Sequence, residues 1–257
     1  MKLGIEWNYD LVCSEDEQAR YIKESGFDAT FVARNDNIDR VMSAIGRWGL
    51  VCENYHAPFF GINDIWTVGD GGEAVVARIC ECIDSCEKYG IPVVVTHLSS
   101  GMTPPRMSDI GFERIDRLMA YAEKRGVRVA VENIRRLDNV AYLLENYPNA
   151  GFCWDVGHEA CYMKGVEFMT LFGDRISALH LHDNTAVYDQ DLHLLPYDGA
   201  IDMDRAAELL GKSPYGGSVM LEVKNSTAGI DDLDTFYKKA ADAARRFASA
   251  AESYRRS

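Results

Sequence analysis

The sequence lacks several features that would set it apart from ordinary globular enzymes. It has no run of 18 apolar residues, no Cys-x-x-Cys spacing and no excess of basic residues. A membrane-spanning helix needs about 20 largely apolar residues in a row, so none is expected. The seven cysteines, an odd number without zinc-ligand spacing, favour reduced thiols over a disulfide framework or a thiolate metal site. Residues 1–6 do not begin a long apolar signal segment, so we expect a cytoplasmic protein.

The charge balance limits the class of partner. Asp and Glu number 40 against 27 Lys and Arg, which gives a formal net charge of −13. Such a chain has no general attraction for a polyphosphate backbone, which disfavours a nucleic-acid partner. Hydrophobic residues make up 47% of the chain and fall in short separated runs, so a sizeable core can form. We therefore expect a folded protein with a small-molecule ligand.

Short β-type runs alternate with longer segments of helical periodicity. The predicted strands lie over residues 2–7, 27–32, 50–56, 92–97, 127–132, 151–155, 176–182 and 219–223. The predicted helices lie over residues 14–25, 36–48, 72–89, 109–125, 138–146, 159–172, 202–211 and 231–253. Eight strand–helix units are what a closed parallel barrel requires, and no linker divides them. The sequence predicts an α/β fold, a single (β/α)8 TIM barrel domain over residues 1–257, in preference to a doubly wound open sheet.

Three predicted connections are longer than a structural turn needs, namely those over residues 57–70, 98–108 and 183–201. All three follow strands rather than helices. In a parallel barrel, the loops that follow strands gather on one face, where active sites are built. The long loops therefore indicate a functional site on that face.

The predicted strand ends carry imidazoles and carboxylates. The residues at these ends are His56, His97, Glu132, Asp155, His180, His182 and Glu222. All six histidines of the chain fall at or just after strand ends, in a barrel where those ends ring a single mouth. Imidazoles and carboxylates without thiolates suit zinc, manganese, cobalt or iron(II). The set therefore predicts one metal-binding assembly.

Each residue also has an ordinary structural interpretation. Asp155 would serve as a helix N-cap and His158 as an exposed side chain, while Asp191 and His193 would lie on a polar surface loop. His182 shares a strand face with His180 and would then only hydrogen-bond to a metal ligand.

Glu222 would be a core carboxylate paired with Lys224 or Arg135, although burying such a charge is costly. Arg135, Arg136 and Lys224 follow strand ends, where they would meet a substrate phosphate or neutralise the carboxylates of the site. Both interpretations stay open at this point.

Six short motifs, taken in order, resemble the xylose-isomerase-like TIM barrel superfamily, which includes sugar phosphate isomerases and epimerases and endonuclease IV. They are His56-Ala57-Pro58-Phe59, Val131-Glu132-Asn133, Asp155-Val156-Gly157-His158, His180-Leu181-His182-Asp183-Asn184, Asp191-Leu192-His193-Leu194-Leu195-Pro196-Tyr197-Asp198-Gly199 and Leu221-Glu222-Val223. Each motif is short, and it is the ordered set over nearly the whole chain that carries the resemblance.

The resemblance implies a divalent metal held by Glu132, Asp155, His180 and Glu222, with His158 touching the substrate. It also implies that Glu132 and Glu222 are the acid/base pair on opposite faces of a sugar. A metal on the carbonyl and hydroxyl oxygens stabilises an enediolate. One carboxylate then removes a proton and the other returns one. Zinc or manganese is the expected ion, with cobalt, iron and magnesium left open.

The resemblance to endonuclease IV implies a larger ligand set for three zinc ions, and every position of that set is a suitable ligand here. The residues beyond the first metal, assigned to a second metal or to substrate, are His56, His97, His158, His182, Asp191 and His193. The net charge of −13 and the absence of a basic stripe stand against DNA repair. The leading hypothesis is therefore a metal-dependent isomerase or epimerase of a small sugar or sugar phosphate. The alternatives are a multi-zinc phosphoesterase acting on abasic DNA and a non-catalytic sugar- or metal-binding barrel. A homo-oligomer is compatible with the sequence.

Overall fold

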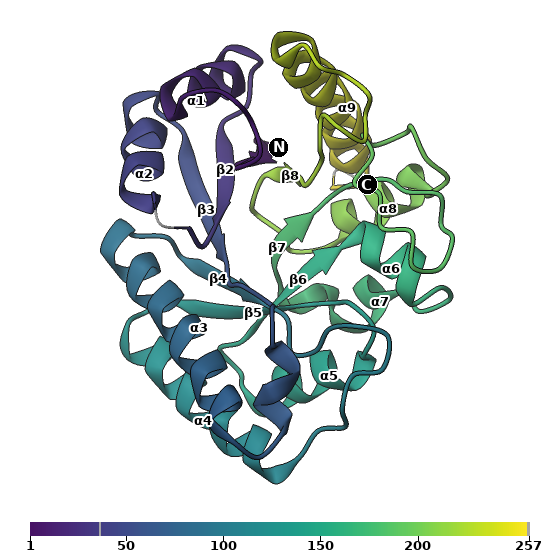
Figure 1. The fold of residues 1–257 in the computed structure, drawn as a ribbon. Helices are drawn as coiled ribbons and strands as arrows, with labels where there is room; N and C mark the ends of the chain where they lie inside the picture. The colour runs from purple at the N-terminus through teal and green to yellow at the C-terminus, as the bar shows by residue number, and fades with distance from the viewer. Residues whose placement is uncertain (36, 256–257) are drawn as a thin grey trace.

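Eight parallel strands form the centre of the molecule (Figure 1). The computed structural model describes residues 1–35 and 37–255. The strands are β1 (Leu3–Glu6), β2 (Ala29–Ala33), β3 (Val51–His56), β4 (Val93–Thr96), β5 (Arg128–Glu132), β6 (Gly151–Asp155), β7 (Ile176–His180) and β8 (Val219–Leu221). Every predicted strand is present, and the predicted TIM barrel is confirmed.

The barrel closes at a narrow seam between β7 and β8. Hydrogen-bonded neighbours run in the order β7-β6-β5-β4-β3-β2-β1-β8. The two end strands meet through a single bridge between Leu181 and Leu221. There, the Leu181 N–H donates to the Met220 carbonyl at 2.9 Å and the Glu222 N–H donates to the Leu181 carbonyl at 3.0 Å. This bridge places His180 and Glu222 on adjacent chain segments at the mouth.

Helices surround the strands. They are α1 (Glu15–Glu24), α2 (Ile38–Arg47), α3 (Asp70–Tyr89), α4 (Asp109–Lys124), α5 (Leu137–Asn146), α6 (Val156–Tyr162), α7 (Phe168–Phe172), α8 (Met203–Lys212) and α9 (Leu233–Arg255), with 3₁₀ turns η1 (Ile62–Trp66) and η2 (Gly173–Arg175). The first residue of the helix predicted over 36–48 lies outside the described residues.

One predicted helix was wrong. The segment 159–172 is not continuous, because α6 begins earlier at Val156 and ends at Tyr162, and α7 begins only at Phe168. Gly165 between them has φ +92°, a left-handed conformation that a continuing helix does not contain. Apolar periodicity continued across this break because Phe168 and Met169 are also buried.

The interior face of the barrel positions the site through strand alternation. In β5, β6 and β7 the small interior residues Ala130, Cys153 and Ala178 are fully buried. Two residues further along the same strands, on the same face, stand Glu132, Asp155 and His180. Small side chains thus fill the barrel below, and larger polar ones line its mouth.

The same alternation holds on the other side of the barrel. Gly4 precedes Glu6 in β1, Ala29 precedes Phe31 in β2, and Met220 precedes Glu222 just past β8. A Cβ on Gly4 would lie 2.5 Å from the end of the Met220 side chain, so a larger residue here would force that side chain to move.

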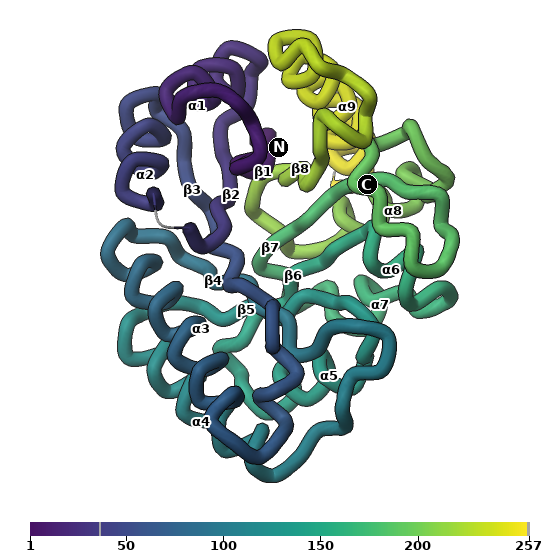
Figure 2. Tube along the Cα trace, viewed as in Figure 1, coloured from purple at the N-terminus to yellow at the C-terminus, as the bar shows by residue number. Residues whose placement is uncertain are grey.

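The two ends of the chain meet at α9. Figure 2 shows the first strands lying beside the last helix, and the Met1 ammonium forms an ion pair with Glu252 of α9. Helix α9 also packs against α8 and β8. Among the described residues no helix is long and apolar enough to cross a membrane.

Candidate functional site

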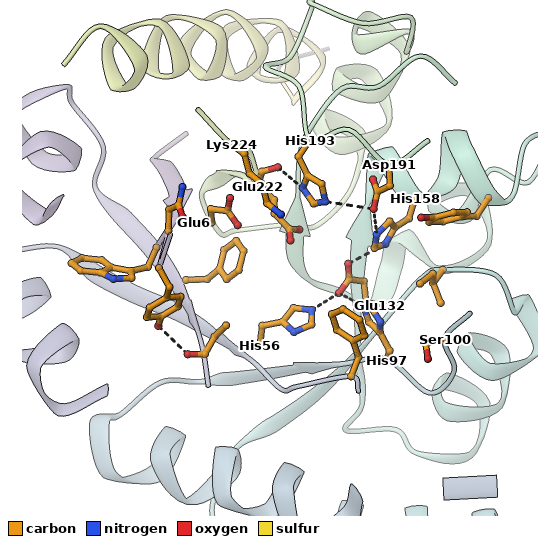
Figure 3. Close-up of a pocket in the computed structure, with 18 of the residues that line it drawn as sticks. Glu6, His56, His97, Ser100, Glu132, His158, Asp191, His193, Glu222 and Lys224 are labelled. Atoms are coloured by element: carbon orange, nitrogen blue, oxygen red, sulfur yellow. Dashed lines mark hydrogen bonds and ion pairs between the residues drawn. The ribbon is translucent and has the colours of Figure 1, made fainter. Parts of the chain in front are cut away.

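A cavity of about 450 Å³ opens at the carboxyl ends of the strands (Figure 3). Residues from β1, β2, β3 and β5 line it, together with the segments that follow β4, β6, β7 and β8. The predicted residues that line it are His56, His97, Glu132, His158, Asp191, His193 and Glu222. Asp155, His180 and His182 lie fully buried beneath them. The structure therefore brings all ten predicted site residues to one place.

Glu132 contacts more of the predicted histidines than one side chain usually does, four in all. Its Oε2 lies 2.9 Å from His56 Nε2 and 3.0 Å from His97 Nε2. Its Oε1 lies 3.2 Å from His158 Nδ1 and 3.4 Å from His180 Nδ1. The Glu132 side chain is 1% exposed, so four imidazoles surround one buried carboxylate.

Four of the residues form a compact set of possible metal ligands. One donor atom each from Glu132, Asp155, His180 and Glu222 lies within 4.8 Å of the others. His180 Nδ1 is 3.0 Å from Glu222 Oε2, across the barrel seam. His180 Nε2 and Asp155 Oδ2 are buried without a hydrogen-bond partner among the described residues. Buried polar atoms are normally satisfied, and imidazole and carboxylate donors suit zinc or manganese, so the residues fit a divalent ion.

A second cluster adjoins the first. His158 Nε2 lies 3.1 Å and His193 Nε2 3.5 Å from Asp191 Oδ2. His182 stacks on His193 with ring centroids 4.2 Å apart, and its Nε2 lies 3.2 Å from Asp155 Oδ1. His182, Asp191 and His193 also form a set with metal-ligand spacing, as do His56, His97 and Glu132. The residues assigned to a second metal or substrate therefore adjoin the four-residue set on two sides.

The charges of the site stabilise one another. Burial raises the pKa of Glu132, but His97 and His180 outweigh it and hold that pKa well below its usual range. Burial likewise raises the pKa of Glu222, and His180 lowers it by more. Burial lowers the pKa of His158, but Asp155 and Asp191 raise it well above the ordinary value.

His97 differs, since burial is dominant there and its pKa is lowered. For both glutamates the neighbouring imidazoles favour the ionised form.

Several structural interpretations are also decided by the geometry. Asp155 is an N-cap, because its Oδ1 accepts from the His158 N–H at 2.6 Å, and it belongs to the four-residue cluster as well. Arg135 lies over the Tyr162 ring at 3.7 Å and pairs with Asp189 at 2.6 Å, so it does not neutralise Glu222.

Arg136 also pairs elsewhere, with the neighbouring Asp138. Lys224 lines the cavity and forms no ion pair within 4.0 Å with any described carboxylate. Two of the three basic residues considered from the sequence therefore lie on the cavity wall.

Sequence reasoning missed Asp183, which organises the loop over residues 183–201. Asp183 is fully buried. Its two carboxylate oxygens accept four backbone N–H bonds of 2.8–3.1 Å, from Asn184, Tyr197, Gly199 and Ile201. These bonds fix the loop that carries Asp191 and His193 into the cavity.

The backbone of this loop is strained. Four non-glycine residues of the described chain have positive φ, and all lie within it: Ala186, Asp189, His193 and Tyr197. Such conformations cost of order 1 kcal/mol or more each and persist where surrounding contacts enforce them, often at functional sites. No local sequence signal marks these four positions.

Sequence reasoning also missed Glu6 at the end of β1. Glu6 lines the cavity, and its Oε1 is buried without a hydrogen-bond partner among the described residues. Burial, helped by the charge of Glu222, raises the pKa of Glu6 to about 8. The strand-end rule that found Glu132 would have found Glu6 had it been applied to the first strand.

A family model described as xylose isomerase-like TIM barrel matches residues 19–250. Two curated relatives are uncharacterized proteins. The uncharacterized protein y4fM of Sinorhizobium fredii is 27% identical over 82% of this chain and 73% of its own length. The uncharacterized protein MJ1311 of Methanocaldococcus jannaschii is 27% identical over 88% of this chain and 84% of its own.

Solved structures resemble the whole chain. A D-tagatose 3-epimerase-like protein has a TM-score of 0.75 at 23% identity, covering 98% of this chain and 99% of its own. A xylose isomerase domain protein from Planctomyces limnophilus has a TM-score of 0.75 at 16% identity, covering 100% and 99%. An L-ribulose 3-epimerase has a TM-score of 0.74 at 18% identity, covering 100% and 96%. At these identities the likeness establishes the fold.

Proposed function

Because this chain belongs to the xylose isomerase-like TIM barrel family, we propose that it is a metal-dependent isomerase or epimerase of a small sugar or sugar phosphate. One observation carries the proposal. Glu132 from β5 and Glu222 from beyond β8 both line one cavity and both contact His180, at 3.4 and 3.0 Å. Two ionised carboxylates approaching one space from different strands suit proton removal and proton return. Epimerases among the similar structures support the same class.

Glu132, Asp155, His180 and Glu222 would hold the divalent ion, and zinc or manganese fits their donor atoms best. When bound, the ion supplies the positive charge that polarises a substrate carbonyl and stabilises an enediolate. The hydrogen bonds from Asn133, whose side chain donates to the Asp155 carbonyl at 2.8 Å and accepts from its N–H at 2.8 Å, keep Asp155 in place.

The acid/base steps belong to the two glutamates. One of them, ionised at neutral pH, takes the proton from the carbon next to the carbonyl, and the C–H electron pair moves into the enediolate. The other glutamate, after taking up a proton from solvent, returns it to the opposite face of that carbon for epimerisation or to the neighbouring carbon for isomerisation. Such acid/base help is worth about 10²–10⁴ in rate.

A second candidate function has its own supporting observation. Glu132 belongs to three sets with metal-ligand spacing, one with His56 and His97, one with Cys153 and His180, and one with Asp155, His180 and Glu222. A carboxylate shared between two ions is an arrangement used in metal-dependent phosphoester hydrolysis. However, Arg135 and Lys224 are the only two Arg or Lys residues lining the cavity among the described residues. With a net charge of −13, abasic DNA is therefore the weaker substrate candidate.

Deuterium uptake from heavy water tests the proposed function. The protein, loaded with Mn²⁺ or Zn²⁺, is incubated with ketoses, ketose phosphates and inososes, and the products are read by NMR. We expect metal-dependent label at a carbon next to the carbonyl, with the labelled position separating epimerase from isomerase. Absence of label across the panel would contradict the proposal. Cleavage of an abasic duplex by the same preparation would then favour the second candidate.

A further inference from the structure

Glu6 lines the cavity, and one oxygen of its carboxyl group lacks a hydrogen-bond partner among the described residues. In Figure 3 its side chain lies across the cavity from His158 and Asp191. Its Oε1 is buried and has no hydrogen-bond partner among the described residues. Leaving a buried polar group unpaired costs about 1–3 kcal/mol, and more for a charged one. Such a group in a folded protein calls for a partner that is absent from the chain itself.

Glu6 belongs to none of the sets with metal-ligand spacing among the described residues. The possible metal-ligand sets in the described chain include the carboxylates of Glu132, Asp155, Asp191 and Glu222, but not that of Glu6. Several other described residues with unpaired buried atoms do belong to those sets. They are His97, Asp155, His180, His182, Asp191 and Glu222. Glu6 therefore has a different role from the residues that would hold metal.

Neighbouring side chains are not the partner either. No ion pair in residues 1–35 and 37–255 includes Glu6, although Lys224 lines the same cavity. The Tyr9 hydroxyl, also on this side, already donates to the Ala33 carbonyl at 2.9 Å. The carboxyl group thus remains free for a ligand.

The surroundings of Glu6 show what kind of ligand fits. Trp7 and Phe31 line the same side of the cavity and are almost fully buried, and Phe31 stacks on His180 with ring centroids 4.5 Å apart. Aromatic faces accept the C–H surface of a small ligand, and one well-placed polar group among them fixes its orientation. A carboxyl group in this role forms a hydrogen bond with a hydroxyl group of the ligand.

We propose that Glu6 is a specificity-determining residue that binds a hydroxyl group of a polyhydroxylated ketose. The inference rests on the proposed function and narrows its substrate class to sugars that present a hydroxyl group to Glu6. Glu132 and Glu222 act on the reacting carbons, and Glu6 selects the sugar.

The test compares Glu6→Leu and Glu6→Gln with the wild type and with Glu113→Gln, an exposed glutamate on α4 away from the cavity. Deuterium uptake gives kcat and KM for the best ketose and for the analogue that lacks one hydroxyl, and titration gives the Mn²⁺ affinity. We expect Glu6→Leu to raise KM about 3- to 10-fold, the equivalent of one hydrogen bond between neutral groups. The kcat and the Mn²⁺ affinity should stay within about threefold, since Glu6 touches neither metal nor reacting carbon.

Two further results sharpen the test. The analogue that lacks the recognised hydroxyl should show the same KM in wild type and Glu6→Leu. Without that hydroxyl there is no hydrogen bond to Glu6 for the substitution to remove. Glu6→Gln, which keeps hydrogen bonding, should raise KM less than Glu6→Leu. We expect Glu6→Gln to melt at the same temperature as the wild type. This variant therefore still tests the inference if Glu6→Leu fails to fold.

An unchanged KM in Glu6→Leu for every ketose, with turnover intact, would overturn the inference and leave the proposed function standing. If the wild type labels no sugar, the proposed function fails, and calorimetry with xylitol and sorbitol on the Mn²⁺-loaded protein tests Glu6 alone. Failure of these polyols to bind, or equal affinity in wild type and Glu6→Leu, would then overturn the inference as well.

Discussion

The two sides of the cavity are built in opposite ways. The imidazole wall consists of His56, His97, Glu132, His158, Asp191 and His193, and nearly every polar group in it contacts another. The aromatic wall consists of Glu6, Trp7, Tyr9 and Phe31, and its one carboxyl group lies among rings without a partner.

Mutual contact among donors is what a metal centre needs, whereas an isolated polar group among rings is what ligand recognition needs. The imidazole wall is therefore suited to the chemical step, and the aromatic wall is suited to selecting the substrate.

The largest expected effect comes from removing one charge from the metal-binding side of the cavity. Glu132→Gln or Glu222→Gln should lower turnover by about 10²–10⁴, because each removes an acid/base group and a metal ligand together. Circular dichroism should show an unchanged fold, and Glu113→Gln serves as the control. Near-wild-type deuterium uptake in both variants would show that these glutamates do not carry out the proton transfer. The proposed difference in role between the two walls would then be wrong.

Strand alternation explains why much of the site could be predicted from the sequence. Polar residues at strand ends, such as Glu132 and Asp155, stand out against the apolar strands that carry them, and a barrel gathers such ends at one mouth. The eight strands followed from the same pattern.

What escaped prediction depends on the tertiary fold. Gly165 breaks a helix whose apolar pattern continues, and the seam at Leu181 and Leu221 depends on barrel closure. The role of Asp183 is visible only once residues up to 18 positions away fold back onto it. Positive φ at Ala186 and Tyr197 likewise has no signature in residue type.

An intermediate effect should follow from loosening the loop that completes the imidazole wall. Asp183→Asn replaces an oxygen that accepts two backbone N–H bonds with an amide donor, which should destabilise the protein by about 3 kcal/mol. Urea unfolding measures this loss. Amide hydrogen exchange should accelerate at Tyr197, Gly199 and Ile201.

Gly199→Ala provides an independent check, because a Cβ there would lie 2.3 Å from Asp183 Oδ1. Slow exchange at these amides in both variants would show that Asp183 does not hold the loop. The aromatic wall lies on other strands. Neither Asp183→Asn nor Gly199→Ala should therefore change the effect of Glu6→Gln.

The smallest effect concerns pH and the metal-free protein. Burial lowers the pKa of His193, but Asp191 raises it by more, to about 9. A raised pKa means that the folded state binds the proton more tightly than the unfolded state does. This contribution to stability is full below the unfolded value of about 6.5 and is lost as the pH rises through about 9. It should amount to up to about 3 kcal/mol in urea unfolding between pH 6.5 and 9.5.

His193→Gln should abolish this pH dependence, and Glu113→Gln should retain it. Metal loading should reduce it, because ligand imidazoles bind metal in their neutral form. An identical pH profile in the His193 variant would contradict the charge assignment of the imidazole wall.

The most direct test of the division between the two walls is anomalous diffraction from crystals grown with Mn²⁺. The account predicts an ion bounded by Glu132, Asp155, His180 and Glu222, with no ion in contact with Glu6. An ion ligated by Glu6, or none among the four residues at saturating Mn²⁺, would contradict the account.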